Sequence, residues 1–263
     1  MTKVSVVVPA YNVAPYLARC LDSLVAQTLP DIEIICVDDK STDNSLEIAR
    51  GYAAKDKRIK VIALPQNGGV GAARNAGLAA AKGEFIHFCD PDDFVDLDFF
   101  EKLYNAAKKD NLDVVRGNFI KYNLDGGIDR GASAKNAAIT NPLCYDYHWI
   151  FLFKKDFLRK NNLKYDEDLP TGQDTVFIMR AMNAYGREVP QIMDANYHYI
   201  IREDSLWQHW LGPRKIKSRI MVIERAIEII NKCEWLADED YGNVARTRYR
   251  QIFDFFYRTT SAE

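Results

Sequence analysis

Uninterrupted apolar stretches alternate with segments of helical spacing through roughly the first 120 residues of the chain. The apolar stretches are short and rich in Val, Ile and Phe, which predicts buried strands at 4–8, 32–37, 59–64 and 85–89, and another beginning at 113. The segments between them predict helices from about residue 15, after residue 43, over 72–81 and over 97–109. Strands that are apolar throughout are covered on both faces, so the alternation predicts a mostly parallel sheet with helices on both sides.

The pattern changes in the second half of the chain. A Gly-, Ala- and Asn-rich stretch at 123–142 predicts a loop, 174–184 a helix and 197–201 a short strand. Isoleucines spaced by three and four residues between 216 and 230 predict an amphipathic helix. The stretch 246–258, rich in Arg and Phe, predicts a last helix that rests on anionic lipid or packs against protein, and its interspersed acidic residues favour packing or a dimer contact.

Composition narrows the class of protein. A hydrophobic content of 48% in 263 residues supports a large core, and a net charge of −2 gives no drive toward nucleic acid. Five cysteines without a CxxC pair predict buried, reduced thiols. The chain enters a strand after three residues and has no apolar run long enough for a bilayer, so we expect a cytoplasmic protein without a signal peptide.

Carboxylates follow two of the predicted strands. Asp38 and Asp39 end the second strand, and Asp90, Asp92 and Asp93 end the strand at 85–89. Because ligands of such sheets bind at the carboxyl ends of the strands, we expect these acids to meet in one crevice with Tyr11 and Asn67. Oxygen ligands on a short turn suit Mg²⁺ or Mn²⁺, which keeps few protein ligands and takes others from a phosphate-bearing ligand. The alternative for Asp38 is a residue that only brackets a turn, and for Tyr11 ordinary loop packing.

Two other enzyme classes are disfavoured by the same loops. The segment 69–74, Gly-Val-Gly-Ala-Ala-Arg, resembles a dinucleotide fingerprint, but it follows the third predicted strand and lacks the third glycine. It is better interpreted as the amino end of a helix that turns Arg74 and Asn75 toward the crevice. A nucleotidyltransferase also gathers carboxylates, but the loop at 9–12 after the first strand has neither the Gly nor the Lys of a triphosphate loop.

Four blocks in order resemble the family 2 glycosyltransferases of the GT-A fold. They are Val-Ser-Val-Val-Val-Pro-Ala-Tyr-Asn at 4–12, Val-Asp-Asp-Lys-Ser-Thr-Asp at 37–43, Asn67 with Ala-Arg-Asn-Ala-Gly at 73–77, and Gly-Glu-Phe-Ile at 83–86 with Asp-Pro-Asp-Asp at 90–93. Gly-Gln-Asp-Thr-Val-Phe at 172–177 is similar to the family's Gly-Glu-Asp motif. The resemblance implies a Rossmann-like GT-A domain over 1–210, with nucleotide-sugar binding in about 1–111 and the acceptor and base part in 112–210, followed by C-terminal helices over 211–263.

The resemblance also implies roles for individual residues. Donor and nucleotide binding falls to Pro9 and Tyr11 beside the nucleobase, Asp39 on the base edge, Asn67, Arg74 on the nucleotide and Asp90 near the ribose. Asp92 would hold the divalent metal, with His198 as a candidate further ligand against the alternative of a packed strand histidine. Asp174 would be the general base of an inverting transfer, against the alternative of a helix amino-end carboxylate. Candidate contacts to the donor sugar or the acceptor are Asp93, Gln173 and Trp207, although Trp207 is equally consistent with a core residue.

Three positions depart from the family pattern. Lys40 stands where the family usually has Gly, and it is strained if the turn needs a positive φ. Gln173 replaces the usual Glu, which leaves Asp174 as the only acid of that motif and is the one feature that favours a catalytically inactive nucleotide-binding partner subunit. Pro91 fills a variable position between Asp90 and Asp92 without removing a ligand.

The favoured interpretation is a metal-dependent, inverting transferase that uses a UDP-sugar to extend a saccharide of a cell-surface polysaccharide or lipopolysaccharide-type glycan. The implied partners are the nucleotide-sugar, a saccharide or lipid-linked saccharide acceptor, and a second copy of the chain in a homodimer. Peripheral contact with the inner face of the membrane would run through the C-terminal helices. The cofactor is Mn²⁺ or Mg²⁺.

Overall fold

The computed structural model describes residues 1–129, 147–202 and 213–233. Within these ranges the strands are β1 (Val4–Ala10), β2 (Ile32–Asp38), β3 (Ile59–Ala63), β4 (Phe85–Phe88), β5 (Phe94–Val95), β6 (Val114–Tyr122), β7 (Phe151–Lys154) and β8 (Gln191–Ile200). The helices are α1 (Ala14–Val25), α2 (Ser45–Ala53), α3 (Gly69–Ala80), α4 (Phe99–Lys109), α6 (Lys155–Lys160), α7 (Gln173–Tyr185) and α8 (Pro213–Asn231).

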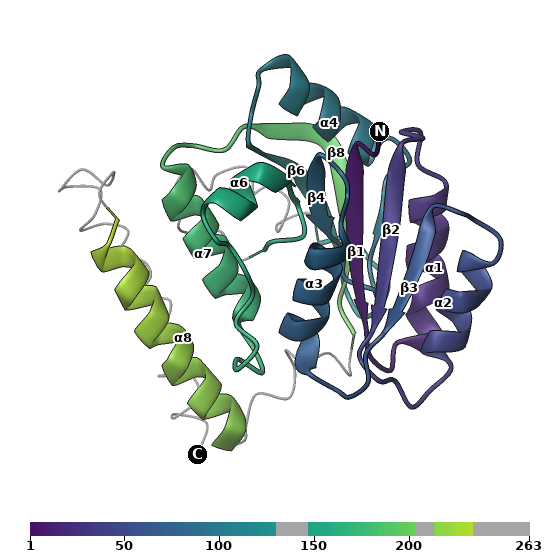
Figure 1. Ribbon diagram of the computed structural model, residues 1–263, viewed down its shortest axis with the longest axis horizontal. Coiled ribbons are helices and arrows are strands. Elements are labelled where there is room, and N and C mark those ends of the chain that lie inside the picture. The colour runs from purple at the N-terminus through teal and green to yellow at the C-terminus, as the bar shows by residue number, and fades with distance from the viewer. Residues whose placement is uncertain (130–146, 203–212, 234–263) are drawn as a thin grey trace.

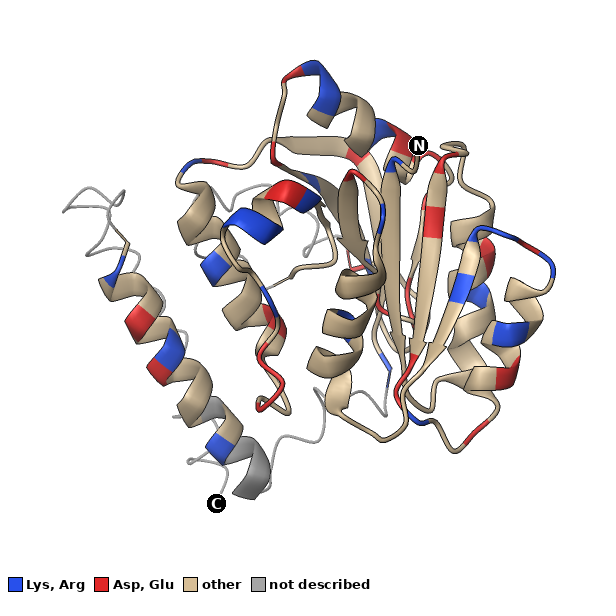
Figure 2. Ribbon diagram, in the orientation of Figure 1, with Lys and Arg blue, Asp and Glu red and all other residues tan. Residues whose placement is uncertain are grey.

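All described strands belong to one eight-stranded sheet in the order β3-β2-β1-β4-β7-β6-β8-β5. The first four strands in that order are parallel, as the apolar alternation predicts. β7 is antiparallel to both β4 and β6, while β6 and β8 are again parallel. The carboxyl ends of β1, β2 and β4 therefore lie at one edge, and Figure 2 shows acidic residues around this end of the sheet.

Helices cover both faces of the parallel half, which confirms the predicted α/β class. Figure 1 shows α3 on one face of β1 and β2, with α1 and α2 on the other. The contact between α3 and β1 is close, because a methyl group on Gly77 would lie 2.3 Å from Cγ1 of Val7. This contact fixes α3, and the Arg74 and Asn75 side chains that it carries, against the strands at the edge of the site.

The core divides into two clusters. The larger is built around the parallel strands and the aromatic residues of β4 and β7. The smaller joins α7 to α8 through Leu169, Val176, Met179, Ala226, Ile229 and Ile230. In Figure 1, α8 runs beside α7 on the side away from β1–β3. The predicted division at residue 210 stays a prediction, but α8 packs directly on the preceding part of the chain.

The structure extends several of the predicted elements. α3 begins at Gly69, three residues before the predicted start, and β6 and β8 are longer than the short strands expected near 113 and 197–201. The cysteines at 20, 36, 89 and 233 are buried and free, as predicted, while Cys144 lies outside the described residues. The predicted loop at 123–142 falls mostly outside them, and Trp207 and the predicted helix at 246–258 fall wholly outside.

Candidate active site

The loops after β1 and β2 are joined by side-chain hydrogen bonds. Oδ1 of Asn12 accepts hydrogen bonds from the backbone N–H of Thr42 (2.8 Å) and from that of Asp43 (3.4 Å). Tyr11 projects outward from this junction with 48% of its surface exposed, whereas Pro9 is buried in β1. The structure therefore places Tyr11 as an exposed aromatic ring at the carboxyl edge of the sheet.

Asp39 is bound to the start of α3. Its two carboxylate oxygens accept hydrogen bonds from the backbone N–H groups of Gly68 (2.7 Å) and Gly69 (2.8 Å). The side-chain amide of Asn67 donates to the Asp39 carbonyl (3.1 Å). Anionic groups are stabilised at helix amino ends by such N–H groups. Asp39 and Asn67, both predicted to bind the donor, thus fix the β2–α3 junction. A nucleobase that contacts Asp39 would have to share the carboxylate oxygens with these backbone N–H groups.

The turn at Lys40 has the positive φ that the family pattern suggests. Lys40 has φ +64°, and the next residue, Ser41, donates its N–H to Oδ2 of Asp38 (3.2 Å). Asp38 is 2% exposed, and its Oδ1 has no hydrogen-bond partner among the described residues. Asp38 thus stabilises the turn, the alternative that the sequence left open, with one acceptor remaining.

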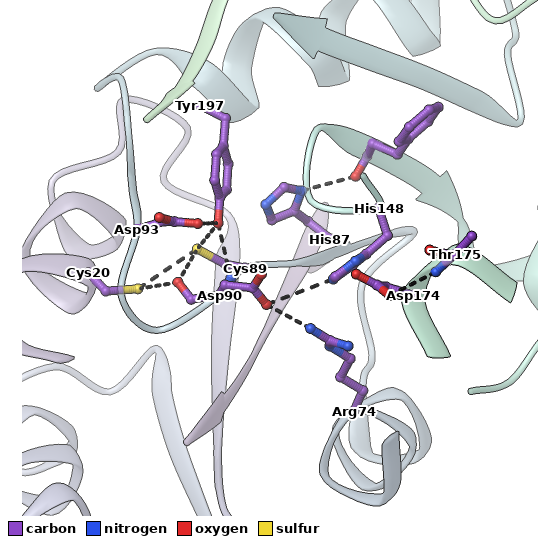
Figure 3. A network of polar contacts seen from close by, with 11 residues as sticks. Cys20, Arg74, His87, Cys89, Asp90, Asp93, His148, Asp174, Thr175 and Tyr197 are labelled. Carbon is purple, nitrogen blue, oxygen red and sulfur yellow. Dashed lines mark hydrogen bonds and ion pairs between the residues drawn. The ribbon is translucent and has the colours of Figure 1, made fainter. Parts of the chain in front are cut away.

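Arg74 and Asp90 form a buried ion pair at the end of β4. Nη2 of Arg74 lies 2.8 Å from Oδ1 of Asp90, and the guanidinium lies 5.1 Å from the centre of the Tyr165 ring. The Arg74 side chain is 5% exposed and that of Asp90 23%, so the carboxylate has the greater access to solvent. Figure 3 shows the pair between α3 and β4. A ligand entering here meets Asp90 first, with the Arg74 charge behind it.

Asp92, the predicted metal ligand, follows Asp90 in the acidic turn, and its side chain is 18% exposed. Burial, together with the charge of Asp90, raises the pKa of Asp92 to about 6 against the opposing effect of Arg202. Nε of Arg202 lies 2.8 Å from Oδ2 of Asp92. A cation beside Asp90 and Asp92 would relieve their repulsion, so this turn fits a divalent metal that takes its remaining ligands from a diphosphate. The described residues contain no group of three or more His, Cys, Asp or Glu side chains arranged to hold a metal.

Asp93 faces the interior. Its carboxyl is 1% exposed and accepts hydrogen bonds from the Tyr197 hydroxyl (2.9 Å) and from the Ile200 N–H (2.8 Å). Burial raises the pKa of Asp93 well above its usual range, and the charges of Asp92 and Asp90 act in the same direction. Asp93 thus anchors β8 to the acidic turn, and its expected contact to a sugar stays a prediction.

His198 is a packed strand histidine, the alternative that the sequence left open. Its Nε2 lies 2.7 Å from Oδ1 of Asp96, its Nδ1 lies 3.0 Å from the Tyr122 hydroxyl, and its ring stacks on Phe94 at 4.2 Å between centres. Both ring nitrogens therefore have hydrogen-bond partners. The role of His198 as a further metal ligand stays a prediction, and it would require one of these contacts to be released.

Asp174 occupies the first turn of α7. Gly172 precedes this helix with φ +75°, a left-handed conformation that favours glycine, and Gln173 is buried. Burial raises the pKa of Asp174, and the Arg74 charge opposes that shift. Figure 3 shows Asp174 with Arg74, Asp90 and His148. The motif residue predicted as general base and the acidic turn after β4 thus meet across the Arg74 guanidinium.

The sequence gives no signal for two residues of this site. His148 and Tyr165 are buried beside Arg74 and Asp90. In the sequence, His148 stands in an aromatic run, which predicts a core residue, and Tyr165 lies in a polar stretch without a recognisable motif. Asn75 is expected to turn toward the crevice with Arg74, but its side chain binds the backbone of Tyr165. Its Nδ2 donates to the Tyr165 carbonyl (2.9 Å), and its Oδ1 accepts from the Tyr165 N–H (2.9 Å).

This geometry defines an α/β enzyme whose ligand binds at the carboxyl edge of a parallel sheet, beside a buried arginine and a carboxylate on a facing helix. The sequence model of Glycosyl transferase family 2 matches residues 5–186, and the chain belongs to that family. The resemblance found in the four sequence blocks is therefore confirmed.

Curated relatives agree with this assignment. The uncharacterized glycosyltransferase EpsJ of Bacillus subtilis is 37% identical over 76% of this chain and 61% of its own length. A poly(ribitol-phosphate) beta-glucosyltransferase of Bacillus spizizenii is 37% identical over 77% of this chain and 33% of its own. A cholesterol galactosyltransferase of Borreliella burgdorferi is 35% identical over 97% and 73%. The chain thus spans less than two thirds of the first two proteins.

Solved structures share the fold. Staphylococcus aureus TarS 1–349 in complex with UDP-GlcNAc has a TM-score of 0.80 at 24% identity, covering 97% of this chain and 73% of that one. The complex of the same protein with UDP has a TM-score of 0.75 at 24% identity, over 92% and 69%. The predicted GT-A fold is thereby confirmed. None of the described helices is long and apolar enough to cross a membrane.

Proposed function

We propose that this glycosyltransferase moves a hexose or N-acetylhexosamine from a UDP-sugar to a hydroxyl group of a saccharide acceptor, with inversion at the anomeric carbon. The acceptor belongs to a cell-wall or other cell-surface polysaccharide. The observation that carries the proposal is the position of Asp174, on the first turn of α7 and within the electrostatic reach of Arg74 and Asp90. The TarS complexes with UDP and UDP-GlcNAc support the choice of donor.

Asp174 acts as the general base. Its carboxylate removes the proton of the acceptor hydroxyl while that oxygen bonds to the anomeric carbon and the bond to the diphosphate oxygen breaks. Attack from the face opposite the leaving group inverts the configuration, as in the one-base logic of inverting enzymes. Burial raises the pKa of Asp174, which makes it a stronger base than an exposed carboxylate, while the Arg74 charge keeps it from being raised further.

A divalent metal belongs to the proposal. Asp92, with Asp90 beside it, would hold Mn²⁺ or Mg²⁺, whose charge would stabilise the departing nucleoside diphosphate. The raised pKa of Asp92, caused by burial and by Asp90, is the feature expected of a carboxyl that a cation would stabilise in its charged form. Arg202 neutralises Asp92 at 2.8 Å here and would have to release it for the cation.

The acceptor is inferred from the functions of relatives. One is a poly(ribitol-phosphate) beta-glucosyltransferase, another a minor teichoic acid biosynthesis protein, GgaB, and a third a cholesterol galactosyltransferase. Two of the three are named for a polyol-phosphate polymer or for teichoic acid biosynthesis, which favours a cell-wall polysaccharide. A lipid-linked acceptor, a cytoplasmic location at the inner face of the membrane and a homodimer remain predictions.

Calorimetric titration tests the donor and the metal together. UDP, GDP, CDP and ADP are titrated with and without Mn²⁺ into the native chain, Asp92→Ala and Asp174→Asn. We expect UDP to bind most tightly, and to lose binding on chelation and in Asp92→Ala. Asp31→Ala, at the amino end of β2 and thus the opposite edge of the sheet, is the matched control and should bind UDP normally. If no nucleotide binds with metal present, the proposal is wrong.

Donor turnover separates an enzyme from an inactive partner subunit. Release of UDP from UDP-sugars is measured with and without extracted cell-wall glycan. Asp174→Asn should bind UDP as the native chain does and release at least a hundredfold less UDP, on the order of the loss typical of removing a general base. Normal transfer by Asp174→Asn would refute the assignment of the base, and UDP binding without any turnover by the native chain would favour the partner subunit.

A further inference from the structure

Several buried polar atoms around Arg74 have no hydrogen-bond partner among the described residues. They are Nε and Nη1 of Arg74, both ring nitrogens of His148 and the hydroxyl of Tyr165. Buried polar groups in folded proteins nearly always have a partner, because leaving one without a partner is destabilising. A group of them in one place marks a site whose partners come from a ligand or from water.

His148 is held rigidly at this place. Its carbonyl accepts a hydrogen bond from the N–H of Phe151 (3.2 Å), and the adjacent Trp149 stacks on Tyr197 with 4.5 Å between ring centres. The imidazole is fully buried and packs edge-on against the Phe88 ring, with 6.1 Å between the ring centres. Its orientation is thus fixed by the protein, and no side-chain hydrogen bond is spent in fixing it.

The His148 ring faces the carboxylate of Asp90 without bonding to it. Nε2 lies 3.9 Å from Oδ1 of Asp90, the same oxygen that pairs with Arg74, as Figure 3 shows. This separation is too long for a hydrogen bond and leaves the nitrogen free for another group. The ring also lies in a fully buried position beside the Arg74 guanidinium, where a neutral imidazole offers one donor and one acceptor.

Tyr165 is held as firmly on the other side of Arg74. Its backbone is clamped by Asn75 of α3, and its ring stacks on Phe177 at 4.2 Å and lies under the Arg74 guanidinium. The charges of both Asp174 and Asp90 act on its hydroxyl, which places that hydroxyl in the same region. A Phe at this position would make the same ring contacts, so packing alone does not explain the hydroxyl.

We propose that His148 and Tyr165 are specificity-determining residues that hydrogen-bond hydroxyl groups of the sugar being transferred. The proposal rests on the function proposed above, because it assumes a nucleotide-sugar donor. Hydroxyl groups both donate and accept, which matches a neutral imidazole and a phenol, whereas phosphate oxygens only accept. The sugar is also the part of the donor that has to lie beside Asp174, since the base acts at the anomeric carbon.

This arrangement favours strong discrimination between donors. A site that hydrogen-bonds a substrate hydroxyl rejects an analogue without it more strongly than an apolar pocket does, because its own buried groups are then left unpaired. Epimers that differ in the direction of one hydroxyl are the relevant competitors. His148 and Tyr165 would therefore determine which sugar is transferred, without changing the affinity for the bare nucleoside diphosphate.

The test uses Tyr165→Phe and His148→Phe, which keep a ring and remove the polar atoms. Dissociation constants are measured by calorimetry for the nucleoside diphosphate that binds, and for its glucose, galactose, N-acetylglucosamine and N-acetylgalactosamine conjugates. Tyr185→Phe is the matched control, since it also removes a buried tyrosine hydroxyl but lies at the far end of α7. We expect each site variant to bind the preferred sugar conjugate about tenfold more weakly and the bare diphosphate unchanged.

Deoxy donors give a second measurement that does not depend on how well a variant folds. On the native chain, a donor that lacks the recognised hydroxyl should bind about tenfold more weakly than its parent. In Tyr165→Phe or His148→Phe, the same omission should cost less than twofold. Equal weakening of the bare diphosphate and of its sugar conjugates, or preferences among epimers that match the native ones, would overturn the role of these residues; such a result would mean that the polar atoms bind water only.

The two proposals fail in different ways. If the native chain binds no nucleoside diphosphate or nucleotide-sugar, the proposed function fails and this inference fails with it. If the native chain binds and discriminates donors while both variants discriminate equally well, only the inference fails.

Discussion

Replacing Lys40 by glycine should stabilise the protein. Lys40 has φ +64° in the turn between β2 and α2, and its side chain is exposed. A left-handed conformation costs a residue with a Cβ atom roughly 1–2 kcal/mol, a cost that glycine does not carry. Glycine in turn loses about 0.4–1 kcal/mol through the greater freedom of the unfolded chain. The net expected gain in the free energy of unfolding is therefore about 0.5–1 kcal/mol.

Thermal and urea denaturation measure this gain. For a domain of this size, about 1 kcal/mol corresponds to roughly 2–4 °C in Tm, so Lys40→Gly should melt about 1–4 °C higher. Asn111→Gly is the control, because Asn111 has φ +46° and asparagine tolerates this conformation with little strain. Asn111→Gly should leave Tm unchanged or lower it slightly. A Lys40→Gly variant that melts at or below the native temperature would refute the strain argument.

The same variant examines whether Lys40 disturbs Asp39. The Asp39 carboxylate is fixed by the N–H groups of Gly68 and Gly69, not by the turn that follows it. UDP affinity should therefore stay within about twofold of the native value in Lys40→Gly, a difference below about 0.4 kcal/mol. A larger change would show that the departure from the family's glycine alters donor binding.

Three further outcomes follow from packing and charge. Gly77→Ala would put a methyl group 2.3 Å from Cγ1 of Val7 and should lower the free energy of unfolding, measured in urea, by about 1–3 kcal/mol. Part of this loss should be recovered in the Val7→Ala background, and an unchanged stability of Gly77→Ala would contradict the close contact. Burial lowers the pKa of His87 to about 4, whereas an unfolded histidine titrates near 6.5, so the unfolded chain binds the proton first as the pH falls. Up to about 3 kcal/mol of stability is therefore lost as the pH falls between these two values. His87→Gln should flatten that part of the stability-against-pH profile, and an unchanged profile would exclude His87 as the cause. Ser218→Ala removes hydrogen bonds to Thr171 and should lower kcat several-fold while UDP binds normally; a parallel loss of UDP affinity would indicate a general structural effect.

The sequence predicts the parallel half of the fold because its signals there are local. Each buried strand is a short apolar run, and each helix has apolar positions on one face. The signal weakens where a strand has mixed surroundings: β8 contains exposed positions near Met193 and Asp194 and was predicted at only half its length. The run from Trp149 to Phe153 is apolar and too short to show a period, so it could not reveal that β7 passes into α6 at Lys155.

The residues of the site also fall into those with a local sequence signal and those without one. Asp90, Asp92 and Asp174 stand in local motifs, and their positions at the ends of elements follow from the sequence. The partners of these residues do not, because they come from distant segments: Arg202 pairs with Asp92 across more than a hundred residues. His148 carries no local signal at all, since a buried histidine is recognised as unusual only when its neighbours in space offer it no hydrogen bond.

The helix α8 illustrates how far the position of the base depends on residues beyond the family pattern, which ends at residue 186. The Ser218 hydroxyl donates to the carbonyl of Thr171 (2.8 Å) and accepts from its N–H (3.2 Å), two residues before α7 begins. A methyl group on Gly172 would lie 2.8 Å from Cγ2 of Val222, so the helix also closes the space around the left-handed residue.

Salt bridges connect α8 to the segment that leads into α7. Arg225 binds the carboxylates of Asp166 (2.7 Å) and Asp168 (2.6 Å), and Asp166 is bound from α7 by Arg180 (2.7 Å). Asp166 follows directly on Tyr165, which the inference above assigns to sugar recognition. A change in α8 can therefore move the base and the sugar-facing tyrosine together, while every residue of the family motif stays the same. Relatives with identical motifs could in this way differ in the sugar or the acceptor that they use.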